Sequence, residues 1–140
     1  MKVLFVCTGN SARSQMAEAL LNEIGEGRFE AFSAGLEPSS VNPFAVEAMA
    51  ELGIDISGAE SKSLERFIDV DDIDLVVTLC SDADARCPIF PAGAAKEHWP
   101  FEDPAAFEGD HTAKLAKFRE IREQISLKLQ DFVSSLKEDK

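Results

Sequence analysis

Four short apolar runs alternate with helical patterns along this 140-residue chain, and this alternation constrains its fold more than any other feature. The runs KVLFV (2–6) and IDLVVTLC (73–80) lack the polar alternation of a half-exposed strand, which indicates strands covered on both faces. Weaker strand patterns occupy 28–35 and 94–100. Strands that alternate with helices are joined by right-handed crossovers, so the sequence predicts an α/β three-layer sandwich with a central four-stranded parallel sheet.

Helix signals fill the intervals between these runs. Apolar residues recur at helical spacing from Met16 to Ile24, and Asn42-Pro43 supplies a cap and a first-turn proline for a second helix. A short helix is expected over 63–69. The final helix has one apolar stripe, formed by Leu115, Phe118, Ile121, Ile125, Leu129, Phe132 and Leu136. No linker or repeat interrupts the chain, so we expect a single domain over residues 1–140 and a monomer.

Charge and cysteine content exclude several classes of function. The net charge is −12, and residues 1–112 hold 21 acidic against 7 basic side chains. Such a surface repels nucleic acid and anionic membranes. No apolar run approaches the roughly 20 residues of a membrane span, and the N-terminus lacks a signal-peptide pattern, so a cytoplasmic protein is expected. Three cysteines fit a secreted disulfide framework poorly and indicate reactive or core thiols.

The stretch CTGNSARS (7–14) carries the strongest functional signal. Cys7 ends the first strand, at the sheet edge where α/β proteins bind their ligands. The residues that follow are small enough for the backbone to curl into a nest of N–H groups: Thr8, Gly9, Asn10, Ser11 and Ala12. Arg13 adds a bidentate fork that suits a tetrahedral oxyanion. This positive environment favours a Cys7 thiolate, and Ser14 is placed to hydrogen-bond it.

Two further cysteines lie far away in the sequence. Cys80 follows the strongest strand, at the same sheet edge as Cys7, and Cys87 comes seven positions later. Taken alone, they are compatible with a buried small residue and a surface thiol. Zinc is a poor alternative, because no C-x2-C occurs and His98 and His111 are the only histidines. We therefore expect no metal site.

The loop CTGNSARS resembles the signature of the low-molecular-weight protein tyrosine phosphatases and of the arsenate reductases built on the same flavodoxin-like fold. The resemblance implies that Cys7 is the nucleophile and that Arg13 and the loop amides hold the oxyanion. It also implies that Asp103, in the pair Asp103-Pro104, is the general acid. Taken alone, that pair would be an ordinary turn signal.

Three stretches, CTGNSARSQMAE, VVTLCSDADARCP and HWPFEDP, resemble the thioredoxin-coupled arsenate reductases specifically. The resemblance implies reduction of arsenate to arsenite for arsenic detoxification, with phosphate or sulfate as weak competing anions. It also implies a relay of thiols, in which Cys7 attacks arsenate, Cys80 attacks Cys7 and releases arsenite, and Cys87 forms with Cys80 a disulfide that thioredoxin reduces.

The spacing of Cys80 and Cys87 has a consequence for this disulfide. If residues 80–87 are helical, the Cα atoms of the two cysteines lie about 10.5 Å apart. A disulfide needs about 4.4–6.8 Å, so we expect this segment to rearrange on oxidation.

The chain departs from the family at two places. Relatives often carry a second loop cysteine where this chain has Ala12, which takes that position out of the relay. Some relatives bind potassium through residues matching Asn10, Glu18, Ser33 and an aspartate. Here Ser63 stands in place of the aspartate, beside Lys62, whose ammonium could replace the ion. We therefore expect no cofactor and no potassium site.

Two alternatives share the same loop. A phosphotyrosine phosphatase would use Cys7, Arg13 and Asp103 and hydrolyse a phosphocysteine intermediate. The chain has no Tyr for an aromatic wall, although Trp99, Phe101 and Phe107 leave room for weak activity toward aryl phosphates. A non-catalytic oxyanion-binding module would function without Cys7 and would leave Cys80 and Cys87 unexplained.

Overall fold

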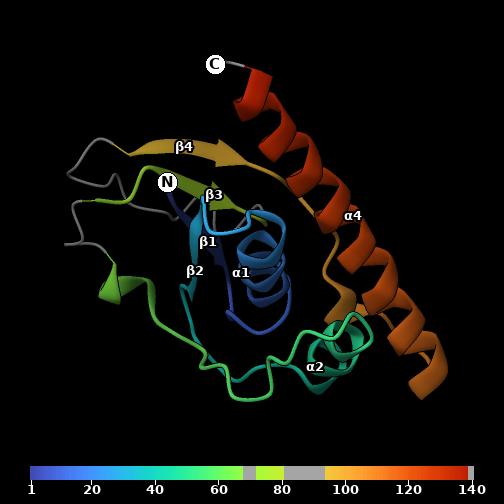
Figure 1. Cartoon of the computed structure of the whole chain (residues 1–140). Coiled ribbons are helices and arrows are strands. Elements are labelled where there is room, and N and C mark those ends of the chain that lie inside the picture. The colour runs from blue at the N-terminus through green and yellow to red at the C-terminus, as the bar shows by residue number, and fades with distance from the viewer. Residues whose placement is uncertain (68–71, 81–93, 139–140) are drawn as a thin grey trace.

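The computed structural model describes residues 1–67, 72–80 and 94–138 and arranges them around one parallel sheet (Figure 1). In chain order the elements are β1 (Lys2–Cys7), α1 (Arg13–Ile24), β2 (Glu30–Gly35), α2 (Pro43–Ala50), η1 (Leu64–Arg66), β3 (Leu75–Thr78), β4 (Ala95–His98), η2 (Pro104–Ala106) and α4 (His111–Glu138). The elements η1 and η2 are single 3₁₀ turns.

The sheet has the strand order β2-β1-β3-β4, and every pair is parallel. The predicted four-stranded parallel sheet is thus confirmed. The strand β2 pairs with one edge of β1 and β3 pairs with the other edge, so the strand order switches at β1. Parallel sheets open a crevice beyond the carboxyl ends of the strands at such a switch. Cys7, the last residue of β1, lies at that point and pairs in register with Gly35 of β2.

Alternate residues of β1 pack into two separate hydrophobic clusters, one on each face of the sheet. Val3, Phe5 and Cys7 pack with the buried faces of α1, α2 and α4, which lie on one side of the sheet (Figure 1). Leu4 and Val6 pack on the opposite face in a smaller cluster that includes Leu64 of η1. This two-sided burial explains why the run KVLFV shows no polar alternation.

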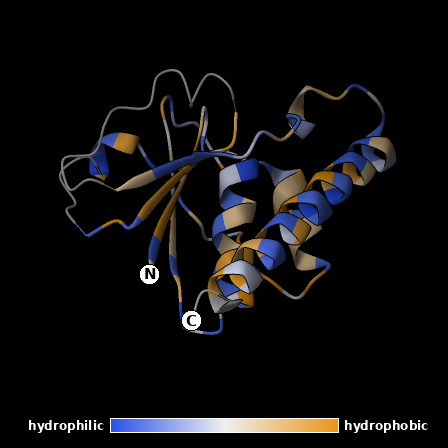
Figure 2. Ribbon diagram, turned by 90° about the horizontal axis from the view of Figure 1, so that it is seen from above, coloured by the Kyte–Doolittle hydropathy of each residue, from blue (hydrophilic) through white to orange (hydrophobic). Residues whose placement is uncertain are grey.

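The expected apolar stripe organises α4. Five of its seven residues are buried, and Phe132 and Leu136 pack against the core while partly exposed. Hydrophobic and hydrophilic bands accordingly alternate along this helix (Figure 2). Within residues 1–67, 72–80 and 94–138, no helix is both long enough and apolar enough to cross a bilayer. At 28 residues α4 has the length, but its exposed face is polar.

Side-chain hydrogen bonds hold both ends of α2. Its N-cap is Asn42, as predicted, since the Asn42 Oδ1 accepts a hydrogen bond from the Phe44 amide at 2.8 Å. At its C-terminal end, Glu51 accepts hydrogen bonds from Arg119 and Arg122 of α4. The hydrogen bonds from Arg119 and then from Arg122 lower the pKa of Glu51 from its usual 4.5 to about 2.

Two expected elements differ in detail. The short helix expected over 63–69 is the 3₁₀ turn Leu64–Arg66, capped by the Ser63 side chain, and 68–69 lie outside the described residues. The run IDLVVTLC forms only four residues of strand, ending at Thr78, two positions before Cys80.

Candidate active site

The loop between β1 and α1 turns its backbone carbonyls outward, toward neighbouring segments. The hydrogen bonds join Thr8 O to Glu37 N (2.8 Å), Gly9 O to Ser39 N (3.1 Å) and Ser61 Oγ (2.9 Å), and Ser11 O to Asn42 N (2.9 Å). In the described part of the chain, no acceptor pairs with the amide N–H groups from Gly9 to Ala12. Outward carbonyls and unpaired amides beside a helix N-terminus are the arrangement that anion-binding nests have.

Close packing between the loop and β2 requires a glycine at position 35. A Cβ built there would lie 2.8 Å from both the Asn10 amide nitrogen and the Thr8 carbonyl oxygen, closer than van der Waals contact allows. The sequence pattern predicts only a strand over 28–35, which this glycine ends. The glycine is required because the loop, which is distant in sequence, comes close to β2. The sequence gives no sign of this contact beyond the glycine itself.

Cys7 lies at the end of a hydrogen-bond chain that begins at the Asn10 side chain. Its Sγ atom is 2.9 Å from the Oγ of Ser14, and the Asn10 side-chain amide donates to the same oxygen at 2.8 Å. Ser14 accepts from Asn10, and toward a Cys7 thiolate, which can only accept, the Ser14 hydroxyl is the donor. A hydroxyl that donates to sulfur stabilises a thiolate. The Cys7 side chain is buried, so the bond is shielded from water.

Arg13 connects the loop to the segment that carries the Asp-Pro pair. Its Nη1 donates to the Phe101 carbonyl at 3.0 Å, and its Nη2 lies 3.9 Å from the Asp103 carboxylate. Asp103 also caps η2 by accepting from the Ala105 amide at 3.0 Å. These groups surround a hollow of about 220 Å³ lined by Cys7, Thr8, Gly9, Ser11, Ala12, Arg13, Asp103 and Ala105. The structure therefore brings the expected nucleophile, anion loop and acid to one hollow.

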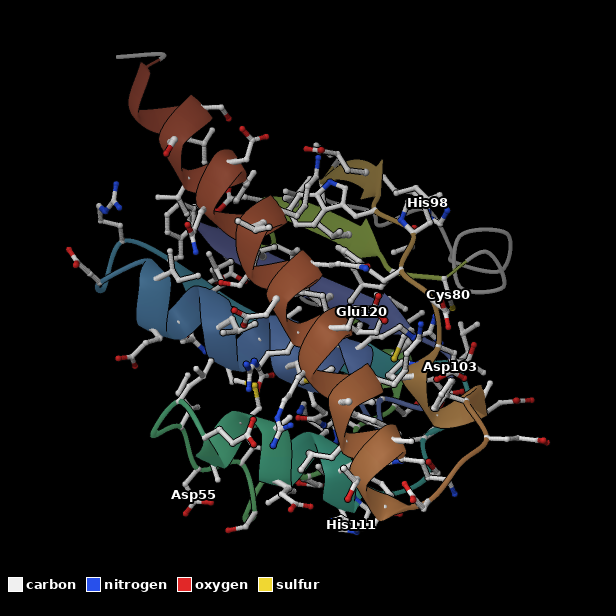
Figure 3. All side chains as sticks on the ribbon, turned by 90° about the vertical axis from the view of Figure 1, so that its right-hand side faces the viewer. Asp55, Cys80, His98, Asp103, His111 and Glu120 are labelled. Atoms are coloured by element: carbon white, nitrogen blue, oxygen red, sulfur yellow. The ribbon has the colours of Figure 1, made fainter. Side chains whose placement is uncertain are left out.

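Cys80 lies at the rim of the same loop. It is half-buried, and its Sγ atom is 3.3 Å from the Oγ1 of Thr8, the residue next to Cys7. Cys80 and Asp103 lie at the edge of the sheet where the strands end (Figure 3). Cys87 and most of the segment expected to rearrange lie outside the described residues, since 81–93 are not described.

A partly buried cation lies behind the loop. The Lys62 ammonium is 3.6 Å from the Glu18 carboxylate, 3.4 Å from Ser33 Oγ and 3.0 Å from the Glu60 carbonyl. Ser33 donates to Glu18 at 3.0 Å, which completes the cluster. Ser63 takes no part in it among the contacts seen and instead caps η1. Across residues 1–67, 72–80 and 94–138, no group of three His, Cys, Asp or Glu side chains is arranged to hold a metal ion.

The sequence pattern assigns no role to Gln15, which the structure buries completely beside the loop. Its side chain contacts Asn10 and the backbone of Glu60. The available signal was a polar residue next to the apolar pair Met16 and Ala17 in the first turn of the predicted helix. Burial of an amide at such a position is costly unless its hydrogen bonds are made.

Comparisons with known proteins agree with this geometry. The sequence profile described as low molecular weight phosphotyrosine protein phosphatase matches residues 2–140. An arsenate reductase of Bacillus subtilis (strain 168) is 43% identical over 133 residues, covering 95% of each chain. One from Staphylococcus aureus (strain N315) is 49% identical over 131 residues, covering 93% of this chain and 94% of its own.

Solved structures give the same picture. An arsenate reductase in the phosphate binding state superposes with a TM-score of 0.81 at 38% identity, over 96% of this chain and 97% of that one. A thioredoxin-dependent arsenate reductase of Corynebacterium glutamicum superposes with a TM-score of 0.73 at 30% identity, over 99% of this chain and 63% of that one.

Proposed function

The chain belongs to the low molecular weight phosphotyrosine protein phosphatase family, and we propose that within it the chain reduces arsenate to arsenite through Cys7, Cys80 and Cys87. One observation carries the proposal: the 3.3 Å between Cys80 Sγ and Thr8 Oγ1. A hydrolase needs only the first thiol, whereas a two-electron reduction of arsenic needs a second thiol beside it. Relatives named arsenate reductases, 43% and 49% identical, support the same conclusion.

The first step is a displacement at arsenic. Arsenate enters the hollow, and its oxygens accept hydrogen bonds from the loop amides and from Arg13. The Cys7 thiolate attacks arsenic while Asp103 gives a proton to the departing hydroxyl, which leaves as water. Asp103 is 47% exposed in its side chain and 3.9 Å from Arg13, so it can meet an oxygen held by that arginine. The product is a Cys7–arsenic(V) adduct.

The second step transfers two electrons. The Cys80 thiolate attacks the Cys7 sulfur, and the sulfur–arsenic bond breaks with its electron pair going to arsenic. Arsenic(V) thereby becomes arsenic(III) and leaves as arsenite, while a Cys7–Cys80 disulfide forms. The Thr8 hydroxyl supports this step by donating to the Cys80 thiolate.

The third step resets the loop. The Cys87 thiolate attacks the Cys80 sulfur, which frees the Cys7 thiolate and leaves a Cys80–Cys87 disulfide. An external dithiol must then reduce this disulfide, and we assign that role to thioredoxin. A relative 30% identical to this chain is named thioredoxin-dependent, which supports the assignment. We place the reaction in the cytoplasm, where thioredoxin keeps thiols reduced.

The Lys62 ammonium takes the place of a bound potassium ion in this proposal. It contacts Glu18, Ser33 and the Glu60 carbonyl, so that one fixed positive charge already satisfies the acidic group behind the loop. Activity is then independent of the monovalent cation in the buffer.

A single-turnover experiment separates the reductase from the phosphatase. Reduced protein and arsenate are mixed without any external reductant, and arsenite and disulfides are quantified by mass spectrometry. One arsenite and one Cys80–Cys87 disulfide per chain are expected, with a trapped Cys7–Cys80 disulfide in Cys87→Ser. A protein that hydrolyses p-nitrophenyl phosphate but forms neither arsenite nor a disulfide would be a phosphatase instead.

A further inference from the structure

We propose that Gln15 is a positioning residue for the oxyanion loop: its side-chain amide orients Asn10, and through Asn10 it directs the Ser14 proton toward Cys7. The inference rests on the proposed role of this loop as the arsenate site. Gln15 touches neither Cys7 nor the hollow, so it acts through its neighbours.

The Gln15 amide bridges two segments that are distant in sequence. Its Nε2 lies 3.0 Å from Asn10 Oδ1, 3.2 Å from the Asn10 carbonyl and 2.9 Å from the Glu60 carbonyl. An amide nitrogen carries two hydrogens. One is shared between the two oxygens of Asn10, and the other reaches Glu60. The anion loop is thereby joined to the 60–62 segment from inside the helix.

The Asn10 side chain is held in one orientation. Asn10 is fully buried and has φ +48°, in the left-handed region that asparagine tolerates better than most residues. Its side-chain oxygen Oδ1 accepts two hydrogen bonds, one from the Gln15 side chain and one from the backbone N–H of Lys62 at 2.7 Å. A flipped Asn10 amide would set its NH₂ group against both donors.

The two hydrogen bonds to Asn10 Oδ1 fix the orientation of the Asn10 amide, and through it the orientation of the Ser14 hydroxyl beside Cys7. With Oδ1 held by two donors, the Nδ2 of Asn10 faces Ser14 and donates to its Oγ at 2.8 Å. The Cys7 sulfur lies 2.9 Å from this oxygen, and toward a Cys7 thiolate, which can only accept, Ser14 offers its hydroxyl proton. Without the Gln15 donor, Asn10 is held by Lys62 alone, and Ser14 loses its fixed orientation.

Only the donors of the Gln15 amide are used. Among the described residues, no donor lies within hydrogen-bond distance of its Oε1. A methionine would fill the same space at less desolvation cost, so burial alone does not explain a glutamine here. Gln15→Met therefore removes the donors at nearly constant volume, and Gln15→Glu replaces them with acceptors that face three oxygens.

A matched control exists on the same helix. The Asn22 side chain also bonds backbone, accepting from the Ala31 amide at 2.9 Å and donating to its carbonyl at 3.3 Å. Asn22→Ala thus removes side-chain hydrogen bonds from α1 without touching the loop.

The test uses inorganic phosphate as the probe, with full-length reduced protein. Calorimetry gives the phosphate affinity, and peptide mapping gives the rate of Cys7 alkylation by iodoacetamide at pH 6. We expect Gln15→Met to weaken phosphate binding and slow alkylation at least tenfold each, Gln15→Glu to do so further, and Asn22→Ala to lower only the melting temperature.

A folded Gln15→Met variant with wild-type affinity and alkylation rate would overturn the inference and leave the proposed function intact. Failure of the wild type itself to bind phosphate would overturn both. If neither Gln15 variant folds, side-chain hydrogen exchange of the wild-type Gln15 amide decides: slow exchange that slows further with phosphate is expected, and fast exchange unaffected by phosphate would overturn the inference.

Discussion

The Oγ1 of Thr8 lies 3.3 Å from the Sγ of Cys80, although 72 positions separate the two residues in the chain. Thr8 follows Cys7 directly, so this contact brings the second thiol to the rim of the anion loop. The neighbouring positions of β1 and β3 make it possible, because both strands end at the same edge of the sheet.

Thr8→Val should slow reduction selectively. The substitution keeps the shape of the side chain and the loop amide but removes the hydroxyl that donates to a Cys80 thiolate. A hydrogen bond to a charged group contributes roughly 1.5–3 kcal/mol, so arsenite release should slow about 10- to 100-fold. Rapid-quench measurement of arsenite checks this, with hydrolysis of p-nitrophenyl phosphate unchanged as the control. Equal losses in both reactions would mean that Thr8 shapes the loop rather than assisting Cys80.

Gly35→Ala should displace the anion loop. The added methyl group would lie 2.8 Å from the Asn10 amide nitrogen and from the Thr8 carbonyl, so the backbone has to shift. We expect loss of phosphate binding by calorimetry, with lower stability as well. Gly58→Ala is the matched control, since nothing lies within 4 Å of a Cβ at that position. Phosphate affinity retained in Gly35→Ala would show that the loop tolerates this approach.

Much of the fold follows from local patterns, and the site follows only in part. The apolar runs and the stripe of α4 predict the sheet and the long helix, because burial on two faces or on one stripe leaves a periodic signal. The loop chemistry is readable because its small residues and Arg13 are contiguous. The roles of Gln15 and Gly35 cannot be predicted from the sequence, because Gln15 bonds Glu60 and Gly35 packs against Asn10, and these segments meet only in the folded chain.

Acid should weaken the ion pairs that join Glu51, at the end of α2, to Arg119 and Arg122 of α4. The pKa of Glu51 is about 2 in the folded chain against a usual 4.5, so folding favours its ionised form. The resulting stability is present above about pH 4.5 and is lost as the pH falls toward 2. Urea titrations from pH 7 to 2 should therefore show a smaller loss below pH 4.5 in Glu51→Gln than in the wild type. Glu108→Gln, an exposed carboxylate, serves as the control; parallel profiles for Glu51→Gln and the wild type would contradict the assignment.

Oxidation should loosen the segment around the second and third cysteines. A helical 80–87 would hold the two Cα atoms about 10.5 Å apart, beyond the reach of a disulfide. Hydrogen exchange on reduced and oxidised protein should therefore accelerate at about residues 80–97 and stay constant in β1 and α4. Unchanged protection together with a Cys80–Cys87 disulfide found by mass spectrometry would mean that the pair is preformed.

The most direct test of the relay is coupled turnover with reduced protein, arsenate, thioredoxin, thioredoxin reductase and NADPH. NADPH oxidation should depend on arsenate, yield one arsenite per NADPH, and cease in Cys7→Ser, Cys80→Ser and Cys87→Ser alike. Hydrolysis of p-nitrophenyl phosphate should survive in the last two variants and fail in the first, because only that reaction needs Cys7 alone. Arsenate-dependent NADPH oxidation that persists in Cys80→Ser would contradict the account.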